Sequence, residues 1–169
     1  IEHVEGTGSL RDRQTVAVTA ADGATRDIQA DAIVVATGSS WPNLPQFPID
    51  GTQILTSQHL LDLDCIPASL LIIGGGVEGC EFAALYSGLG TEVTMVELMA
   101  CALPLEDEDI SATTARELKK RGVKVLTGTT VERLERSPVA VTAHLKDGSQ
   151  VTAEKLLISV GRGMNSRGI

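Results

Sequence analysis

The chain has 169 residues, enough for one full domain and part of a second. A net charge of −8 disfavours a nucleic-acid partner, and no apolar run reaches the roughly 20 residues that span a bilayer. Aromatic residues make up only 2% of the chain, so we expect an aliphatic core typical of buried parallel strands. Three widely spaced cysteines and no signal peptide indicate a cytoplasmic protein without a membrane anchor.

The first third of the chain is expected to be β-rich. Residues 14–19 alternate in polarity, Asp22-Gly23 is a turn signal, and residues 32–36 form a short apolar run before Thr37. Three prolines then fall within residues 41–48, where they disfavour both a helix and an interior strand. We interpret this segment as an extended linker at a domain boundary.

Beyond the linker, predicted strands and helices alternate. The strands cover 69–73, 92–97, 124–127 and 156–160, the helices cover 77–89 and 106–121, and a hairpin joins 139–145 to 150–152. Carboxylates at residues 106–109 and cations at 119–121 suit the two ends of a helix dipole and need no chemical role. The pattern predicts an α/β fold: a Rossmann-type parallel sheet with helices and an added antiparallel β-meander.

One glycine-rich turn carries the chemistry. Gly74, Gly76 and Gly79 form a G-x-G-x-x-G pattern between a buried strand and a helix, the context that gives this pattern its meaning. The first glycine permits a tight turn, the second lets backbone approach a pyrophosphate, and the third lets helix and strand pack closely. We therefore predict a dinucleotide site at this helix N-terminus, made by Gly74, Gly75, Gly76, Val77, Glu78 and Gly79.

An acidic residue supports NAD as the dinucleotide. Glu97 ends the next predicted strand, 18 residues after Gly79, where a carboxylate accepts hydrogen bonds from the adenosine ribose. Residues 98–100 contain no arginine to neutralise a 2′-phosphate, so NAD is favoured over NADP. Glu81 lies on the first turn of the same helix as the glycines. It either faces solvent or serves a reacting centre, and the residues alone leave both readings open.

No other constellation suggests catalysis. His3, His59 and His144 lie near no candidate nucleophile or metal-ligand cluster, and we expect them to be surface or structural residues. We predict no metal site and no Ser-His-Asp or Cys-His arrangement.

Several motifs in fixed order resemble the FAD- and NAD-dependent pyridine nucleotide–disulfide oxidoreductases, most closely the dihydrolipoamide dehydrogenases. They are residues 36–39, the proline-rich linker, the stretch 73–81, Val96-Glu97 and residues 160–162. The resemblance covers essentially the whole chain. It implies that residues 1–39 are a β-rich remnant of an FAD domain, that 40–160 are the NAD domain, and that 161–169 begin the returning FAD segment.

The resemblance also implies roles for individual residues. The FAD-side positions are Gly8, Thr37, Gly38 and Ser39. On the NAD side, Glu97 matches the ribose-binding position, Val131 the residue flanking the adenine, and Gly161 the residue closing over the nicotinamide. Glu81 matches a glutamate beside the nicotinamide, which favours a catalytic role over a solvent-facing one.

The departures from the family pattern limit the expected activity. An N-terminal FAD fingerprint and the C-terminal dimerisation domain are absent, and none of Cys65, Cys80 or Cys101 has a cysteine partner at the family's redox spacing. We expect a piece of a larger enzyme that binds NAD(H) without reducing a disulfide. The intact protein would be a homodimer associated with 2-oxoacid dehydrogenase complexes. Alternatives are an NADH oxidase, a coenzyme A–disulfide reductase, a mercuric reductase or a non-enzymatic NAD(H) sensor.

Overall fold

The computed structural model describes residues 1–42 and 44–169; Asn43, which belongs to the predicted linker, lies outside the described residues. The chain divides into two compact units. The smaller unit comprises Ile1–Ser40 and Arg162–Ile169, and the larger unit comprises Trp41–Gly161.

The smaller unit contains two antiparallel sheets. Strands β1 (Thr7–Leu10), β2 (Thr15–Thr19) and β3 (Thr25–Gln29) form one sheet in that order. The predicted turn after β2 is present, and Asp22 Oδ1 accepts the Ala24 N–H at 2.9 Å. The second sheet pairs β4 (Ser39–Ser40) with β13 (Gly163–Met164), so the two segments of this unit lie side by side.

One expected β segment is not a strand. Residues 32–36 carry no strand assignment, and Val34 and Val35 are 88% and 51% exposed. An apolar strand needs neighbours that cover it. Among the described residues no strand pairs with this run, so its apolar sequence alone did not make it a strand.

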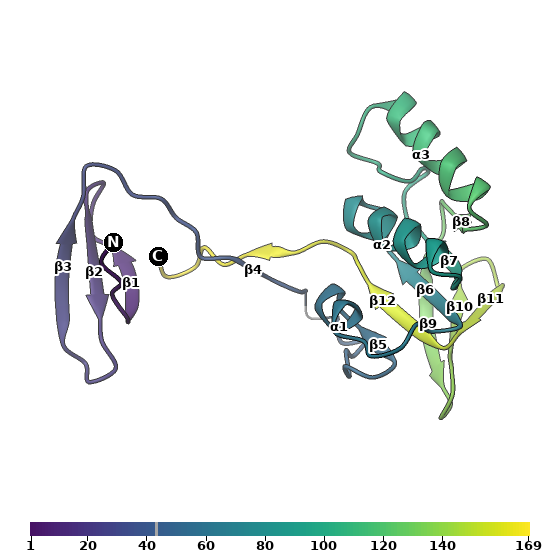
Figure 1. Cartoon of the computed structure of the whole chain (residues 1–169), viewed down its shortest axis with the longest axis horizontal. Coiled ribbons are helices and arrows are strands. Elements are labelled where there is room, and N and C mark those ends of the chain that lie inside the picture. The colour runs from purple at the N-terminus through teal and green to yellow at the C-terminus, as the bar shows by residue number, and fades with distance from the viewer. Residues whose placement is uncertain (43) are drawn as a thin grey trace. The chain divides into compact units, whose positions relative to one another are not determined.

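The larger unit is built on a five-stranded parallel sheet (Figure 1). Its order is β5 (Ile54–Leu55), β12 (Lys155–Ile158), β6 (Ser69–Ile73), β7 (Glu92–Val96) and β8 (Lys124–Leu126). The order places the last strand, β12, between β5 and β6. This is the Rossmann-type sheet that the alternating pattern predicted.

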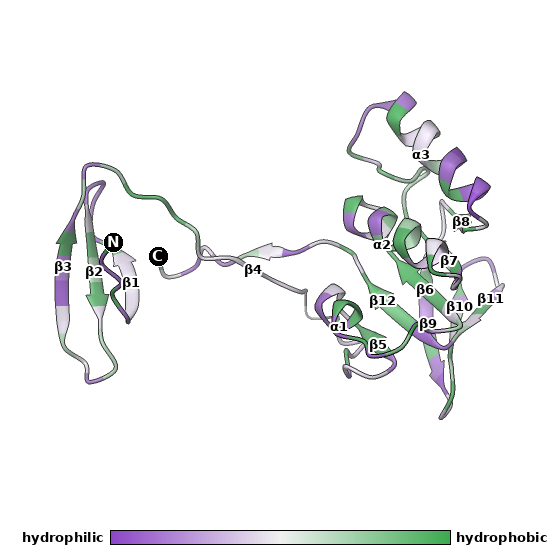
Figure 2. Ribbon diagram, viewed as in Figure 1, coloured by the Kyte–Doolittle hydropathy of each residue, from purple (hydrophilic) through white to green (hydrophobic). Residues whose placement is uncertain are grey.

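Each face of this sheet is covered by a different layer. Helices α1 (Ser57–Leu61), α2 (Val77–Gly88) and α3 (Glu108–Lys120) contribute Leu60, Phe82 and Leu118 to the core on one face. The antiparallel meander covers the other face and consists of β9 (Val131–Arg136), β10 (Val141–Leu145) and β11 (Gln150–Ala153). Consecutive residues of β6 alternate between these cores, because side chains along a strand point to opposite faces. Figure 2 shows the hydrophobic character of β6 and β12.

The C-terminal end of the predicted linker packs against the larger unit. Phe47 is 6% exposed and packs in the meander-side core, and its N–H donates to the Leu44 carbonyl at 2.8 Å. The end of the linker is therefore part of the larger unit rather than a free connector.

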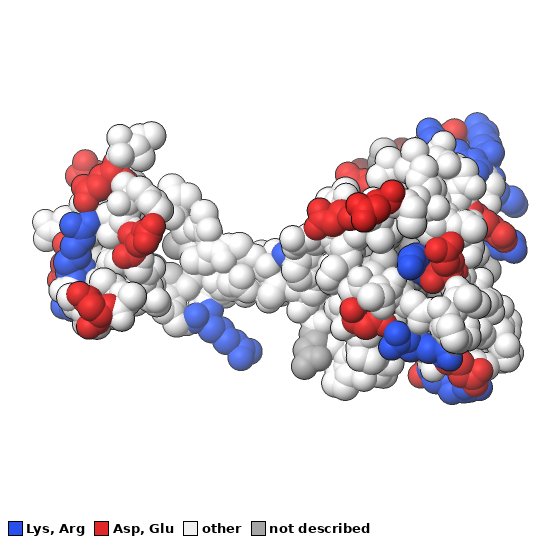
Figure 3. All heavy atoms as spheres, turned by 60° about the horizontal axis from the view of Figure 1, so that its bottom comes forward, with Lys and Arg blue, Asp and Glu red and all other residues white. Residues whose placement is uncertain are grey.

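Charged side chains of both signs lie on the surface of the larger unit (Figure 3). None of the described helices has the length and apolarity needed to cross a bilayer.

Candidate dinucleotide-binding site

The glycine turn begins where β6 ends, and backbone contacts fix its first residue. The Gly74 N–H donates to the Val96 carbonyl at 2.8 Å, which ties the turn to the end of β7. Gly74 has a φ of 110°, and a Cβ there would lie 2.0 Å from the Ser159 carbonyl oxygen. Both the backbone conformation and the close approach of β12 therefore require glycine.

The other two motif glycines differ from each other. A Cβ on Gly79 would lie 2.0 Å from the Gly74 carbonyl oxygen, so this glycine allows α2 to pack against the turn. A Cβ on Gly76 would meet no atom within 4 Å. Gly76 is the N-cap of α2 and supplies no side-chain hydrogen bond to the helix. Its open backbone surface therefore adjoins helix N–H groups that favour an anion.

Glu97 is held against this turn. Its Oε2 accepts the Gly75 N–H at 2.6 Å, and its Oε1 accepts the Met99 N–H at 2.7 Å. The residue is only 7% exposed. Since an ionised carboxylate offers about four acceptor sites, two amide bonds leave capacity for ligand hydroxyls. The contacts fix the position of the carboxylate relative to the glycines.

The segment after β7 folds over the turn. The Leu103 N–H donates to the Gly75 carbonyl at 2.7 Å, and Leu103 adopts a left-handed φ of 51°. The Cys80 thiol donates to the same carbonyl at 3.5 Å. Burial raises the pKa of Cys80 to about 11, with the charge of Glu97 acting in the same direction and the Leu103 backbone opposing it. Cys80 is thus a neutral structural thiol at pH 7.

A cavity of about 480 Å³ opens beside the turn. Gly74, Gly76, Glu97, Thr129 and Gly161 are among its lining residues. It lies at the carboxyl ends of the parallel strands, where open α/β sheets bind ligands, and its volume is in the usual range for ligand pockets. A larger cavity of about 820 Å³ contains none of these residues. The chemistry of the lining therefore identifies the smaller cavity as the candidate site.

Two polar side chains at this site were missed from the sequence. The Thr129 hydroxyl is buried and has no hydrogen-bond partner within the part of the chain that the structure describes. The Ser159 hydroxyl donates to Glu78 Oε2 at 3.1 Å, linking the end of β12 to the first turn of α2. Both residues follow the carboxyl ends of parallel strands, and that position was the signal available in the sequence.

The structure brings some of the predicted NAD-site residues together and leaves others apart. Gly74, Gly76, Glu97 and Gly161 line the cavity, whereas Gly75, Val77, Glu78 and Gly79 belong to the turn and helix behind it. Glu81 is exposed on α2 and does not line the cavity. Val131 is 5% exposed in the meander-side core, directly after Thr130, which does line the cavity.

The predicted FAD-side residues lie in the smaller unit. Asn165 forms hydrogen bonds there with three groups of Thr37 and Gly38. The Asn165 N–H donates to the Gly38 carbonyl at 3.1 Å, and its Nδ2 donates to the Thr37 carbonyl at 3.2 Å. The Thr37 hydroxyl donates in turn to the Asn165 carbonyl at 2.6 Å. Ser39 accepts hydrogen bonds from Arg162, while Gly8 lies on the exposed strand β1.

Among the described residues, the remaining histidines and cysteines form no metal-binding cluster. Cys65, Cys80 and Cys101 are free thiols. His59 contributes to the capping box of α1 through Thr56, and His144 lies 3.2 Å from the Glu135 carboxylate. His3 is exposed.

Together, the parallel sheet, the glycine turn at the start of α2 and the buried carboxylate after β7 define a dinucleotide-binding fold. Comparison with known proteins assigns the family. The chain belongs to the pyridine nucleotide-disulphide oxidoreductases, whose family profile matches residues 1–169. Family membership confirms the resemblance seen in the sequence, and it implies the use of FAD and NAD(H).

Individual relatives agree with this assignment. An NAD(P)H dehydrogenase (quinone) of Mycobacterium tuberculosis is 34% identical, covering 100% of this chain and 36% of the relative. The dihydrolipoyl dehydrogenase of Bacillus subtilis is 37% identical over 96% of this chain and 35% of its own. Among solved structures, LpdA of M. tuberculosis has a TM-score of 0.81 and 34% identity, covering 98% of this chain and 37% of its own. The chain thus spans little more than a third of these relatives.

Proposed function

We propose that residues 40–160 are the NAD(H)-binding domain of a dihydrolipoamide dehydrogenase-like flavoenzyme. Residues 1–39 and 161–169 would then be parts of its FAD domain, with Gly8, Thr37, Gly38 and Ser39 on the flavin side. The intact enzyme passes a hydride between flavin and NAD, and the cofactors supply that chemistry when bound. Its expected setting is a cytoplasmic homodimer associated with 2-oxoacid dehydrogenase complexes.

The observation that carries this proposal is the open backbone of Gly76 beside the fixed carboxylate of Glu97. Nothing lies within 4 Å of a Cβ at Gly76, and Glu97 is anchored through Gly75. A pyrophosphate fits beside Gly76 because helix N–H groups and the helix dipole favour an anion there. Ribose hydroxyls fit beside Glu97 because its carboxylate can still accept further hydrogen bonds.

Other residues of the cavity complete the fit. The buried Thr129 hydroxyl has no partner among the described residues, so a ligand there gains a hydrogen bond that the protein alone leaves unmade. Gly161 would face the nicotinamide half. Val131 would support the adenine end from the core, behind Thr130. Glu81 would act beside the nicotinamide only in the intact enzyme, since it is exposed here.

We further propose that this chain alone binds NAD(H) without reducing a disulfide. Cys80 is a buried neutral thiol, and Cys65 and Cys101 have no disulfide partner. No two cysteines have the spacing of the family's redox pair. Its contribution to the intact enzyme is therefore to bind and orient the nucleotide.

A substitution at Thr129 tests this site. Thr129→Val removes the hydroxyl and preserves the shape of the side chain, so we expect weaker NADH binding by calorimetry with no loss of thermal stability. Thr152→Val, an exposed change on β11, is the matched control and should bind normally. Unchanged NADH affinity in Thr129→Val, or no NADH binding by the unsubstituted chain, would contradict the proposal.

A quinone is a second candidate acceptor for the intact enzyme. The observation that favours it is the 34% identity to an NAD(P)H dehydrogenase (quinone) over the whole of this chain. Assays of the full-length protein with NADH and either lipoamide or a quinone would separate the two acceptors. Faster turnover with the quinone would identify a quinone as the acceptor instead of lipoamide. It would not affect the proposal that the chain binds NAD(H).

A further inference from the structure

Strand β8 is an outer strand of the parallel sheet with an open side. It pairs with β7, and among the described residues no strand pairs with its other edge. The Leu126 carbonyl faces β7, where it accepts the Glu97 N–H at 2.8 Å. Since consecutive residues of a parallel strand direct their backbone groups to opposite sides, the N–H and carbonyl of Val125 face the open edge.

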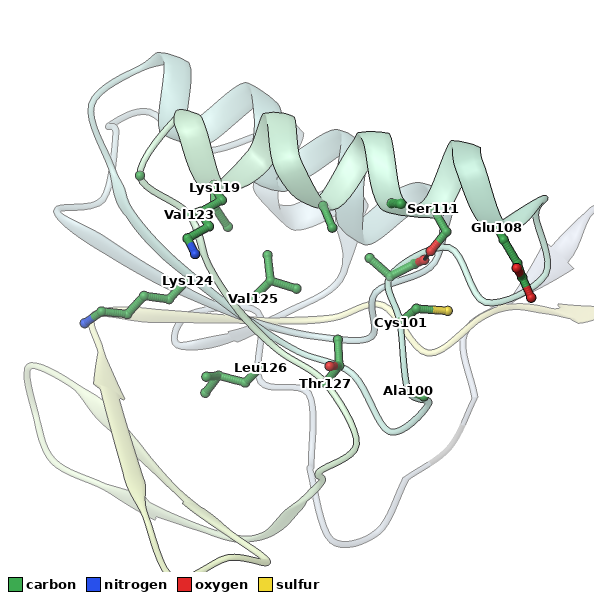
Figure 4. A pocket seen from close by; sticks show the side chains of 14 residues that line it. Ala100, Cys101, Glu108, Ser111, Lys119, Val123, Lys124, Val125, Leu126 and Thr127 are labelled. Carbon is green, nitrogen blue, oxygen red and sulfur yellow. Dashed lines mark hydrogen bonds between the residues drawn. The ribbon is translucent and has the colours of Figure 1, made fainter.

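The open edge is flanked by a cavity on each face of the sheet. The larger, of about 820 Å³, lies between α3 and β8 (Figure 4). It is lined largely by small and aliphatic side chains, including Ala112, Ala115, Val123 and Val125. The other, of about 490 Å³, lies between β8 and the turn joining β10 to β11. Val125 lines both cavities, so neither α3 nor the meander covers the outer edge of β8.

Opposite charges mark the two ends of α3, the helix beside the larger cavity. Glu108 and Asp109 lie in its first turn, and Lys119 and Lys120 lie in its last. Figure 4 shows Glu108 at one end of the cavity and Lys119 at the other. An element that is acidic at one end and basic at the other is complementary to a second copy of itself in antiparallel orientation.

We propose that this edge binds a second copy of the chain through a two-fold axis at Val125. The two β8 strands pair antiparallel, and each Val125 donates its N–H to the Val125 carbonyl of the other copy. The α3 helices lie antiparallel across the larger cavities, which places the Glu108 end of one copy against the Lys119 end of the other. The interface is self-complementary and closed, because each copy uses up its open β8 edge.

This interface is independent of the proposed nucleotide site. The larger edge cavity shares no lining residue with the cavity that contains Gly76 and Glu97, and the smaller edge cavity shares only Thr129, which none of the dimerisation variants changes. Self-association and NADH binding can therefore fail separately.

Sedimentation equilibrium of the 169-residue chain tests the proposal. We expect a reversible monomer–dimer equilibrium between 17.7 kDa and twice that mass. Added salt should weaken the dimer because it screens the end charges. A chain that remains monomeric at every concentration and at low salt would overturn the proposal.

A charge exchange tests the antiparallel arrangement. One variant carries Glu108→Lys and Asp109→Lys, and the other carries Lys119→Glu and Lys120→Glu. Like charges then face each other in either homodimer, so each variant alone should dimerise about tenfold more weakly or less well still. An equimolar mixture should recover the dimer, because each variant then meets its complement. The antiparallel arrangement would be overturned if either variant alone dimerised as tightly as the unsubstituted chain, or if the mixture did not recover the dimer.

Substitution of Val125 tests the pairing of the strands. Val125→Pro removes the outward N–H without removing a hydrogen bond to β7, and we expect a monomer that retains NADH binding and its circular dichroism. Val125→Thr keeps the N–H and the β-branched shape, and it should still dimerise. A folded, dimeric Val125→Pro protein would exclude pairing at this edge.

Discussion

The Glu97 carboxylate accepts a hydrogen bond from the Gly75 amide at 2.6 Å, which joins the end of β7 to the glycine turn. Its second oxygen accepts the Met99 amide at 2.7 Å. The sequence motif predicts that this acid binds the ribose of a nucleotide. The structure adds that the same side chain organises the turn at which the pyrophosphate would bind.

Glu97→Gln should therefore weaken NADH binding in two ways. The amide NH₂ group would face a backbone N–H where an oxygen now accepts one, and the charge that favours ribose hydroxyls and opposes a 2′-phosphate would be lost. A hydrogen bond to a charged group contributes about 1.5–3 kcal/mol, so we expect about a tenfold loss of NADH affinity or more. Calorimetry with NADH and NADPH should also show a smaller preference for NADH.

The control for this substitution is Glu132→Gln, an exposed change on β9. It should preserve both affinities. If Glu97→Gln binds NADH as tightly as the unsubstituted chain does, the carboxylate neither organises the turn for NADH binding nor binds the ribose.

Gly76→Ala should separate binding from folding. Its φ of −72° suits alanine, and the added methyl group meets no protein atom within 4 Å, so thermal stability should change by no more than about 2 °C. The methyl group occupies space needed for close approach of a pyrophosphate, so NADH affinity should fall at least about tenfold.

Two other glycines provide matched comparisons for Gly76. Gly88→Ala also meets no atom within 4 Å and lies in α2 away from the turn, so it should preserve NADH binding and slightly stabilise the helix. Gly79→Ala would place a Cβ 2.0 Å from the Gly74 carbonyl and should destabilise the fold. Normal NADH affinity in Gly76→Ala would place the nucleotide elsewhere.

Much of the larger unit could be predicted from its sequence because local patterns there agree with the tertiary fold. Residues 70–73 of β6 are all apolar and are buried on both faces, and Gly74 marks the start of the turn. Helix α2 was predicted to cover residues 77–89, and it covers Val77–Gly88. Short elements were missed, including α1 and the two-residue strand β5, because their patterns are too brief to resolve.

Long-range contacts account for what the sequence did not show. The run at residues 32–36 is apolar like β6, yet no described strand pairs with it. At the site, the bond from Leu103 to Gly75 and the burial of the Thr129 hydroxyl depend on segments distant in sequence. The spacing of the motif predicted which glycines matter but did not predict the groups that surround them.

The three cysteines should differ in reactivity. Cys80 is buried, and its pKa is raised to about 11, so almost none of it is thiolate at pH 8. Cys65 and Cys101 are exposed. Iodoacetamide at pH 8 should label these two rapidly and Cys80 only after unfolding, as mass spectrometry of peptides would show. Rapid labelling of Cys80 in the folded chain would contradict the burial.

Asp50 should contribute stability that depends on pH. Burial alone would raise the pKa of its carboxyl, but the N–H groups of Thr52, Ile54 and Gln53 and the Thr52 hydroxyl outweigh burial and lower the pKa from 3.8 to about 2. A carboxyl with a lowered folded-state pKa stabilises the fold above its unfolded pKa and loses that contribution as pH falls through the folded value. The difference corresponds to about 2 kcal/mol, fully present above about pH 5 and lost towards pH 2.

Asp50→Asn should therefore lower the free energy of unfolding at pH 7 by about 2 kcal/mol, and the loss should shrink as the pH approaches 2. The substitution also removes the ion pair with Arg136, whose Nη2 lies 2.5 Å from Asp50 Oδ2. Urea unfolding at a series of pH values measures the difference, with the exposed Asp31→Asn as control. A loss that stays constant from pH 7 to pH 2 would show that ionisation of Asp50 is not its source, because protonation of the native carboxyl should remove most of the advantage over asparagine.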